Sequence, residues 1–127
     1  ELQKIISQVS SGVLDTKYEY KGNVVENEEG DHLKGNPNAP IKMIEYSDYD
    51  CPFCKRHHET LTSVVEESEG QISWVFRHWP IHESAVPKVI TAECVTQIKG
   101  NDAFWKFSEL VFEMLDTGEQ KSVMEGL

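Results

Sequence analysis

The segment YSDYDCPFCKRHHE, Tyr46–Glu59, contains two cysteines three positions apart, separated by Pro52 and Phe53 and followed closely by two adjacent histidines. A Cys-x-x-Cys pair can ligate zinc, close a structural disulfide or form a redox-active dithiol. The segments on either side of the pair help to distinguish among these uses.

The residues around the cysteines predict a strand, a helix and a second strand. Ile41–Ser47 is apolar on both faces, which is typical of a central, doubly covered strand, with Glu45 inside it. Segment 55–70 carries an apolar stripe at helical spacing and is expected to end at Gly70. Gln71–Pro80 alternates as a strand does. This order predicts two parallel strands joined by a crossover helix.

Two further helices are predicted after Pro80. The first has an apolar side chain at every fourth position, which predicts a stripe facing the core and a buried free thiol at Cys94. The members of this stripe are Val86, Ile90, Cys94 and Ile98. Asn101 or Asp102 is expected to cap the second helix. The side chains predicted to point inward from that helix are Phe104, Phe107, Val111, Met114 and Leu115.

The N-terminal part reads as an extension of a single domain that spans residues 1–127. Residues 1–13 have helical apolar spacing and residues 17–25 alternate, so we expect a helix and a strand within residues 1–30. The chain begins with Glu1 and not Met, which indicates a processed or cut form in which a signal peptide or membrane anchor is not visible. No apolar run approaches the roughly 20 residues of a membrane helix.

The composition restricts the class of partner. Acidic residues outnumber basic ones by 22 to 12, and the formal net charge is -10. This charge argues against binding to nucleic acid or to anionic membrane surfaces. Three cysteines are too few for a small scaffold held together by disulfides.

A Cys-x-x-Cys pair at the junction of a strand and a helix has an asymmetric environment. Cys51 falls at the helix N-terminus, where unpaired N–H groups and the helix dipole stabilise a thiolate. Pro52 suits the first helical position, because an N–H group there would have no partner within the helix and its absence costs no hydrogen bond. Cys54 lies one turn further along and is shielded by the helix. One exposed nucleophile and one buried resolving thiol are what thiol–disulfide exchange requires.

The two adjacent histidines favour zinc less than they first suggest. His57 and His58 diverge by about 100° on a helix, so at most one of them can join the cysteines, and a fourth ligand is missing nearby. We expect instead that Lys55, His57 and His58 add positive potential near the thiols.

Three segments resemble the DsbA-like thiol:disulfide oxidoreductases, a branch of the thioredoxin superfamily. They are DHLKGNPNAPIKMIEYSDYDCPFCKRHHETL, FRHWPIHESA and TAECVTQIKGNDAFWKFSELVFEML, which together extend from about Asp31 to Leu115. The resemblance rests on Gly-Asn-Pro before the strand, Glu-Tyr-Ser-Asp-Tyr before CPFC, and Phe-Trp in a later helix. It implies a thioredoxin-like α/β fold with inserted helices after the second core strand.

The resemblance also assigns roles to the residues of the motif. Cys51 is implied to attack and Cys54 to resolve, while Pro52 and Phe53 tune the reduction potential. Because this dipeptide lacks the histidine of the strongest oxidants, we expect a less oxidising pair. Glu45 is implied to lie beneath the pair and to assist proton transfer at the buried thiol. A lone carboxylate in an apolar strand should have a raised pKa, which suits a proton carrier.

The resemblance further implies a loop with a cis-proline facing the thiols, then a hairpin and a last helix. All five prolines precede that point, so we expect the C-terminal part of the core to be missing. An unfinished sheet leaves an open edge and uncovered apolar surface. We therefore expect an oligomer, such as a domain-swapped or intertwined homodimer.

The leading hypothesis is a periplasmic or otherwise extracytoplasmic thiol:disulfide oxidoreductase. It would exchange disulfides with cysteine-containing proteins and with a redox partner protein, using the Cys51–Cys54 disulfide and no metal or organic cofactor. A non-catalytic thioredoxin-like scaffold with a structural disulfide is the alternative. A zinc-binding Cys-x-x-Cys module is the third possibility.

Overall fold

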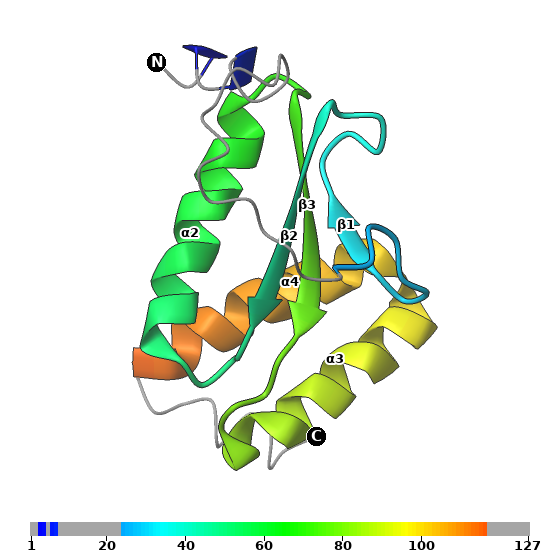
Figure 1. Ribbon diagram of the computed structural model, residues 1–127. Helices are drawn as coiled ribbons and strands as arrows, with labels where there is room; N and C mark the ends of the chain where they lie inside the picture. The colour runs from blue at the N-terminus through cyan, green and yellow to red at the C-terminus, as the bar shows by residue number, and fades with distance from the viewer. Residues whose placement is uncertain (1–2, 5, 8–23, 117–127) are drawn as a thin grey trace.

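The computed structural model describes residues 3–4, 6–7 and 24–116 of the chain. Figure 1 shows the order of its elements along the chain. They are β1 (His32–Lys34), β2 (Ile41–Ser47), α2 (Pro52–Glu67), β3 (Ile72–His78), the 3-10 turn η1 (Glu83–Ala85), α3 (Val86–Lys99), α4 (Asn101–Glu113) and the 3-10 turn η2 (Met114–Asp116). Residues 3–4 and 6–7 are helical, while the rest of the predicted N-terminal helix and most of the predicted strand 17–25 lie outside the described residues.

The sheet has the strand order β1-β3-β2. β2 and β3 are parallel, with Ile41 opposite Ile72 and Ser47 opposite His78, so the predicted strand–helix–strand unit is confirmed. The short β1 pairs antiparallel with the other edge of β3. The prediction that Ile41–Ser47 is the central strand is wrong. β3 takes the centre because it pairs on both edges, and it is buried from Ile72 to Arg77.

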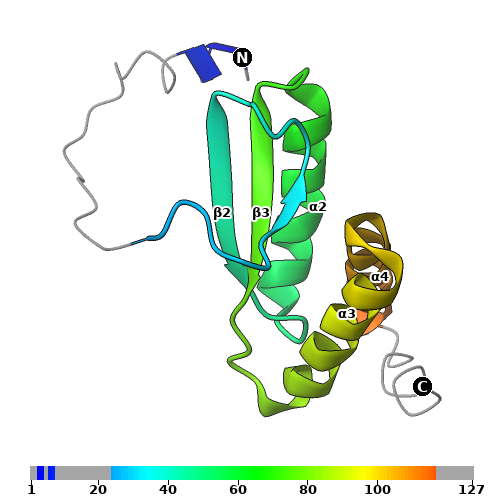
Figure 2. The same ribbon diagram turned by 90° about the vertical axis from the view of Figure 1, so that its right-hand side faces the viewer.

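One face of the sheet carries the hydrophobic core. Figure 2 shows α2 and α4 on the same side of the strands. Large side chains of β3, α2 and α4 meet there with the small side chain of Ala92 from α3. The buried members of this cluster are Ile6, Tyr49, Leu61, Val65, Ile72, Trp74, Phe76, Ala92, Phe104, Trp105, Val111 and Phe112. Cys54 packs against this cluster, so the core adjoins the Cys motif.

Helix α2 begins at the predicted place and ends early. Cys51 is its N-cap residue and Pro52 occupies the first turn, as expected. The helix ends at Glu67 with Ser68 as C-cap, before the predicted Gly70. The turn that follows contains Glu69 at φ 53° and Gly70 at φ 81°, so both residues have left-handed backbone conformations.

Helix α3 turns a different face to the core than its sequence predicts. Lys88 and Ala92 are its buried residues. The predicted inward stripe faces solvent: Val86, Ile90 and Ile98 are exposed apolar side chains, and Cys94 is an exposed free thiol. Both the buried stripe and the buried Cys94 were wrong predictions. The helix instead packs through the neighbouring face, where the small Ala92 allows a close approach to the core.

Helix α4 follows α3 without a side-chain cap. Gly100, at φ 86°, occupies the N-cap position, so neither Asn101 nor Asp102 has the predicted capping role. The Asn101 side chain donates a hydrogen bond to the Leu33 carbonyl oxygen at 2.8 Å instead, which ties α4 to β1. The predicted inward side chains are confirmed in large part, since Phe104 and Val111 are fully buried. The other three, Phe107, Met114 and Leu115, are partly buried.

Within the described ranges, no helix combines the length and the apolar character that crossing a lipid bilayer requires.

Candidate active site around Cys51 and Cys54

Cys51 lies where β2 has ended and α2 begins. Its backbone is extended, with φ -92° and ψ 118°, and Pro52 follows at the start of the helix. The Cys51 N–H donates to the Asp48 carbonyl oxygen at 3.2 Å, and the Cys51 carbonyl oxygen accepts from the Lys55 N–H at 3.1 Å. The thiol is free and half-buried. Cys51 therefore sits at the N-terminus of α2, beside the unpaired N–H groups at the positive end of the helix dipole.

Cys54 lies one helical turn further on and is also half-buried and free. Burial raises the pKa of the Cys54 thiol, and its hydrogen bond with the Cys51 thiol raises it further. The Asp48 backbone and the Ser47 hydroxyl act in the opposite direction without cancelling this effect. The two thiols thus interact directly, and this interaction adds to the raised pKa of Cys54.

Glu45 points into the protein from β2, as predicted, and is 8% exposed. Its carboxylate accepts a hydrogen bond from the Trp74 indole N–H, with 2.9 Å between Nε1 and Oε2. Burial raises the pKa of Glu45 to about 7, although the contacts with Trp74 and Ser47 favour the charged form. The carboxyl group can therefore both hold and release a proton near neutral pH.

Ser47 connects these two groups, and sequence reasoning missed it. It follows Glu45 by two positions in β2, so both side chains project from the same face of the sheet. Its hydroxyl is buried and has no hydrogen bond of ordinary geometry among the described residues. It is nevertheless close enough to favour the charged forms of Glu45 and Cys54. The period of two from Glu45 was the signal that could have found it.

Asp48 fixes the loop that leads to Cys51. This carboxylate is 1% exposed. It accepts a hydrogen bond from the Asp50 N–H at 2.7 Å and two from His82, through the backbone N–H and ring Nδ1, each at 2.8 Å. Burial opposes the charge, but these donors together outweigh it and lower the pKa of Asp48. A buried, ionised Asp48 thus binds the Cys loop to the chain after β3.

Asp50, immediately before Cys51, makes a second link of the same kind. Its carboxylate oxygens contact the Lys88 ammonium of α3 and the Ser84 hydroxyl of η1. Lys88 is buried apart from a small part of its side chain. Because opposite charges pair there, Lys88 places a cation next to the residue that precedes Cys51. Sequence reasoning did not find this cation, because Lys88 lies far along the chain.

His58 does not have the predicted electrostatic role. Its ring is buried among the Trp74, Trp105 and Phe112 rings, with centroid distances of 4.9, 6.3 and 4.9 Å. Burial lowers the pKa of His58 to about 4, so the ring is neutral at neutral pH and adds no positive charge near the thiols. His57 is exposed and Lys55 is half-buried, and their predicted influence on the thiols stays a prediction.

Exposed apolar side chains flank the motif. Phe53, inside the Cys-x-x-Cys pair, is 72% exposed, and the Arg56 guanidinium lies 4.7 Å from the centre of its ring. Trp79 and Ile81, in the segment that leads to His82, are also largely exposed. Trp74 belongs to the core and cannot contact a substrate.

Cys51 and Cys54 do not belong to a cluster with metal-binding potential in the described part of the chain, where such a cluster forms elsewhere from His32, His78 and Glu93. The zinc interpretation of the motif therefore lacks the additional ligands that a tetrahedral site needs.

Known proteins show which family has this arrangement. The model of the family described as Thioredoxin matches residues 27–125. The disulfide bond formation protein D of Bacillus subtilis is 27% identical over 101 residues, which are 77% of this chain and 46% of that protein. A protein named Na(+)/H(+) antiporter NhaA 1, from Mycolicibacterium gilvum, is 32% identical over 89 residues, which are 69% of this chain and 14% of that protein.

A solved structure gives the same result. The crystal structure of Pseudomonas aeruginosa DsbA2 superposes with a TM-score of 0.60 and 31% sequence identity, over 73% of this chain and 50% of that one. The present chain thus spans half or less of the length of these relatives. The expected thioredoxin-like α/β fold with two helices after β3 is confirmed. The chain belongs to the thioredoxin family, in which it resembles the DsbA-like thiol:disulfide oxidoreductases.

Proposed function

We propose that this chain is a thiol:disulfide oxidoreductase that exchanges disulfides with cysteine-containing proteins. The observation that carries the proposal is the paired thiol geometry. Cys51 is the N-cap residue of α2, and Cys54 hydrogen-bonds with it and has a pKa raised by burial. Such a pair provides the unequal nucleophile and leaving group on which exchange depends.

In the oxidising direction, a substrate thiolate attacks the Cys51 sulfur of the Cys51–Cys54 disulfide. The bond between the two cysteines breaks, a substrate–Cys51 disulfide forms, and Cys54 leaves with the electron pair. A second substrate thiolate then attacks the substrate sulfur and expels Cys51. The substrate is oxidised to a disulfide by two electrons, and the Cys51–Cys54 pair is reduced to the dithiol. In the reverse direction Cys51 attacks a substrate disulfide and Cys54 resolves the intermediate.

We propose that Glu45 supplies the proton that Cys54 takes up when it leaves. The Cys54 thiol has a raised pKa, so its thiolate is a good proton acceptor, and the pKa of Glu45 near 7 keeps part of its population protonated at neutral pH. Ser47 lies near both groups, and a rotation of its buried hydroxyl would let it relay the proton between them. This route supports the role that the family resemblance assigns to Glu45.

The substrate class and compartment follow from the same proposal. Unfolded polypeptides expose apolar side chains beside their cysteines, and the exposed Phe53, Trp79 and Ile81 offer contacts for them. We place the chain in a periplasmic or other extracytoplasmic compartment, since dithiols that oxidise proteins act where disulfides persist. A separate redox protein must then reoxidise or reduce the Cys51–Cys54 pair after each cycle.

A glutathione redox titration tests the proposal. The oxidation state of the Cys51–Cys54 pair is followed by mass spectrometry after acid quenching, with insulin reduction and refolding of a reduced substrate measured alongside. Cys51→Ser should abolish both activities, and Cys54→Ser should accumulate substrate mixed disulfides. Cys94→Ser is the matched control and should behave as wild type, because Cys94 lies exposed on α3.

The same titration distinguishes the alternatives. A reversible pair with activity supports the enzyme, and a potential less oxidising than that of the strongest oxidants supports the proposed effect of the Pro-Phe dipeptide. A pair that stays oxidised across all buffers supports a scaffold with a structural disulfide. One equivalent of zinc that protects both thiols from alkylation would support the zinc module and overturn the proposal.

A further inference from the structure

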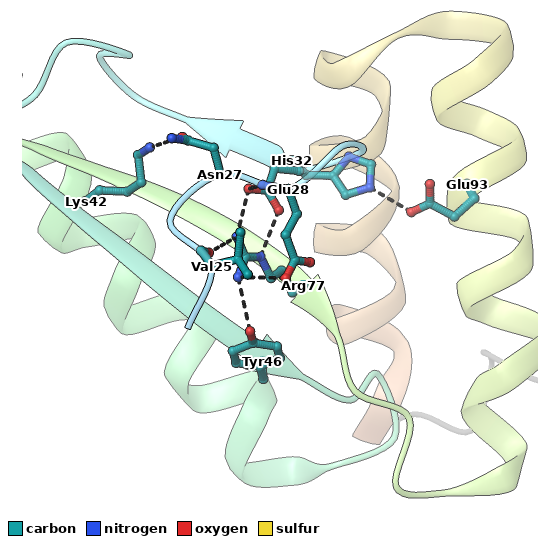
Figure 3. Close-up of polar contacts among 9 residues, drawn as sticks. Val25, Asn27, Glu28, His32, Lys42, Tyr46, Arg77 and Glu93 are labelled. Atoms are coloured by element: carbon teal, nitrogen blue, oxygen red, sulfur yellow. Dashed lines mark hydrogen bonds and ion pairs between the residues drawn. The ribbon is translucent and has the colours of Figure 1, made fainter. Parts of the chain in front are cut away.

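Three side chains from separate elements converge beside the sheet, outside the dithiol site. They are His32 of β1, His78 at the end of β3 and Glu93 of α3. Glu93 Oε1 lies 2.7 Å from His32 Nε2 and 3.0 Å from His78 Nε2. Figure 3 shows the His32 ring pointing directly at the Glu93 carboxylate. One atom of each side chain lies within 4.8 Å of the corresponding atom of the other two.

We propose that His32, His78 and Glu93 form a binding site for a divalent transition-metal ion, with Zn²⁺ as its expected occupant. Two imidazole nitrogens and one carboxylate oxygen are an established ligand set for zinc and for other first-row divalent ions. Metal–ligand bonds of roughly 2.0–2.2 Å separate the donors of a tetrahedral site by about 3.4 Å. The two N–O distances here are slightly shorter than that, so admission of an ion requires Glu93 to move outward.

The two imidazoles are held in place by packing. The His32 ring stacks on Phe104 with a centroid distance of 3.5 Å and nearly parallel planes. The His78 ring contacts the edges of Tyr49 and Phe76 at 5.5 and 5.3 Å. Both histidine side chains are largely buried, whereas that of Glu93 is 41% exposed. Two fixed ligands and one adjustable ligand are a suitable arrangement for capture of an ion from solution.

A cavity of about 330 Å³ gives the ion access and leaves room for a water ligand. His32, His78 and Glu93 all line it, together with the carboxylate-bearing residues Glu28, Glu29 and Asp31. Asp31 is neutralised by its ion pair with Arg77, but the lining retains more acidic than basic side chains. The cavity therefore attracts cations, and a fourth, non-protein ligand can complete a tetrahedral shell.

Binding of the ion would join the sheet to α3. β1 and β3 each supply one histidine and α3 supplies the carboxylate, so the ion would strengthen the link between the paired strands and α3 that the His–Glu93 hydrogen bonds already make. A ligand that binds only the folded state stabilises it by mass action. Zinc should therefore raise the melting temperature of the protein in proportion to the logarithm of its concentration.

The test uses a tag-free chain in which Cys51, Cys54 and Cys94 are all replaced by Ser, because thiolates also bind zinc. Isothermal titration with Zn²⁺ should give one equivalent per chain, and Co²⁺ should give visible d–d absorption without a sulfur charge-transfer band. Glu93→Gln and His78→Gln should each weaken zinc binding at least tenfold and abolish the thermal shift. Glu66→Gln and His57→Gln, on exposed positions of α2, are the matched controls and should leave binding unchanged.

Glu93 is partly exposed, so its amide variant should fold, and circular dichroism checks this point. Unchanged zinc affinity in both ligand variants would overturn the proposal. The absence of stoichiometric zinc binding to the folded Cys-free chain would overturn it as well. Equal affinity for Ca²⁺ or Mg²⁺ would exclude a site built on imidazole nitrogen, because those ions select oxygen ligands.

Discussion

At Glu45, a single buried carboxyl group couples folding to pH. Its pKa is about 7 in the folded protein and 4.5 in the absence of the fold. Between pH 4.5 and pH 7, the folded protein holds a proton on Glu45 that the unfolded chain has released. The free energy of unfolding therefore falls as the pH rises from 4.5 to 7. Above pH 7 the carboxylate is charged in both states, and its burial destabilises the folded protein by the full amount. The same proton is the one that the proposed mechanism transfers to Cys54.

Replacing the Glu45 carboxyl group should separate its effect on stability from its proposed role in proton transfer. Glu45→Gln keeps the size of the side chain and an oxygen acceptor for the Trp74 N–H. At pH 8.5 the variant should be more stable than the wild type by about 2–3 kcal/mol, whereas at pH 4 the two should be equally stable. Urea denaturation at the two pH values measures the difference. Disulfide exchange should be slower in the variant at every pH.

Glu59→Gln, on an exposed position of α2, is the control and should show no pH-dependent gain. Equal stability of Glu45→Gln and wild type at pH 8.5 would mean that the Glu45 carboxylate carries no burial cost.

Single residues were predictable where sequence neighbours determine them. The places of Cys51, Pro52 and Glu45 follow from the junction between a strand and a helix. The inward position of His58 was also within reach, because it precedes Leu61 by three positions and Val65 by seven, on one helical face. The polar residues on both sides of it, Lys55 to His57 and Glu59, concealed this pattern. Lys88 could not be found, because only the folded chain brings it to Asp50.

Among the elements, the turn after α2 carries a local strain. Glu69 is the one non-glycine residue in the described ranges with positive φ, at 53°. This left-handed conformation brings Cβ close to a carbonyl oxygen and costs an ordinary residue about 1–2 kcal/mol. Glycine avoids this clash, but it also makes the unfolded chain more flexible. The higher conformational entropy of the unfolded state offsets part of the stabilisation.

Glu69→Gly should accordingly stabilise the protein by about 0.5–1 kcal/mol, the difference between these two effects. Thermal and urea denaturation measure it. Glu66→Gly is the matched control three positions earlier, inside α2, and should destabilise by about 1 kcal/mol. Destabilisation by both substitutions would show that the Glu69 side chain makes a favourable contact that outweighs the strain.

The elements also show what a periodic pattern can and cannot predict. The helices were recognised from apolar spacing, and α3 (Val86–Lys99) covers the stripe from Val86 to Ile98 that predicted it. The pattern did not identify the face that meets the core, because α3 has apolar side chains on two faces. Its packing face was decided by the small Ala92 and by the ion pair that Lys88 forms with Asp50. The central place of β3 likewise depended on β1, which has only three residues.

At the scale of the whole molecule, α3 presents an apolar surface to solvent. Val86, Ile90 and Ile98 are 42%, 59% and 74% exposed, and Cys94 lies on the same stripe. Contiguous apolar surfaces of this kind are typical of interaction sites. The oligomer expected from the sequence, such as a domain-swapped or intertwined homodimer, stays a prediction, and this stripe is the surface on which it can be tested.

Light scattering at micromolar concentration should then report a dimer, and Ile90→Lys should shift it to a monomer, because a charge at the centre of the stripe opposes burial. Val25→Lys, on an exposed apolar residue before β1, makes the same change of charge and should leave the dimer intact. A monomeric wild type, or a dimer that persists in Ile90→Lys, would contradict association through α3.

The links from Asp48 to His82 and from Asp50 to Lys88 determine how the region opens. If the segment around His82 leaves its place, the buried Asp48 carboxylate loses two of its donors, and if the first turn of α3 moves with that segment, Asp50 loses its cation as well. Local opening there costs more than the release of an ordinary surface loop. The Cys loop, η1 and the first turn of α3 should therefore fluctuate as one cooperative unit. A partner protein that bound α3 could then alter the reactivity of Cys51 without contacting its sulfur atom.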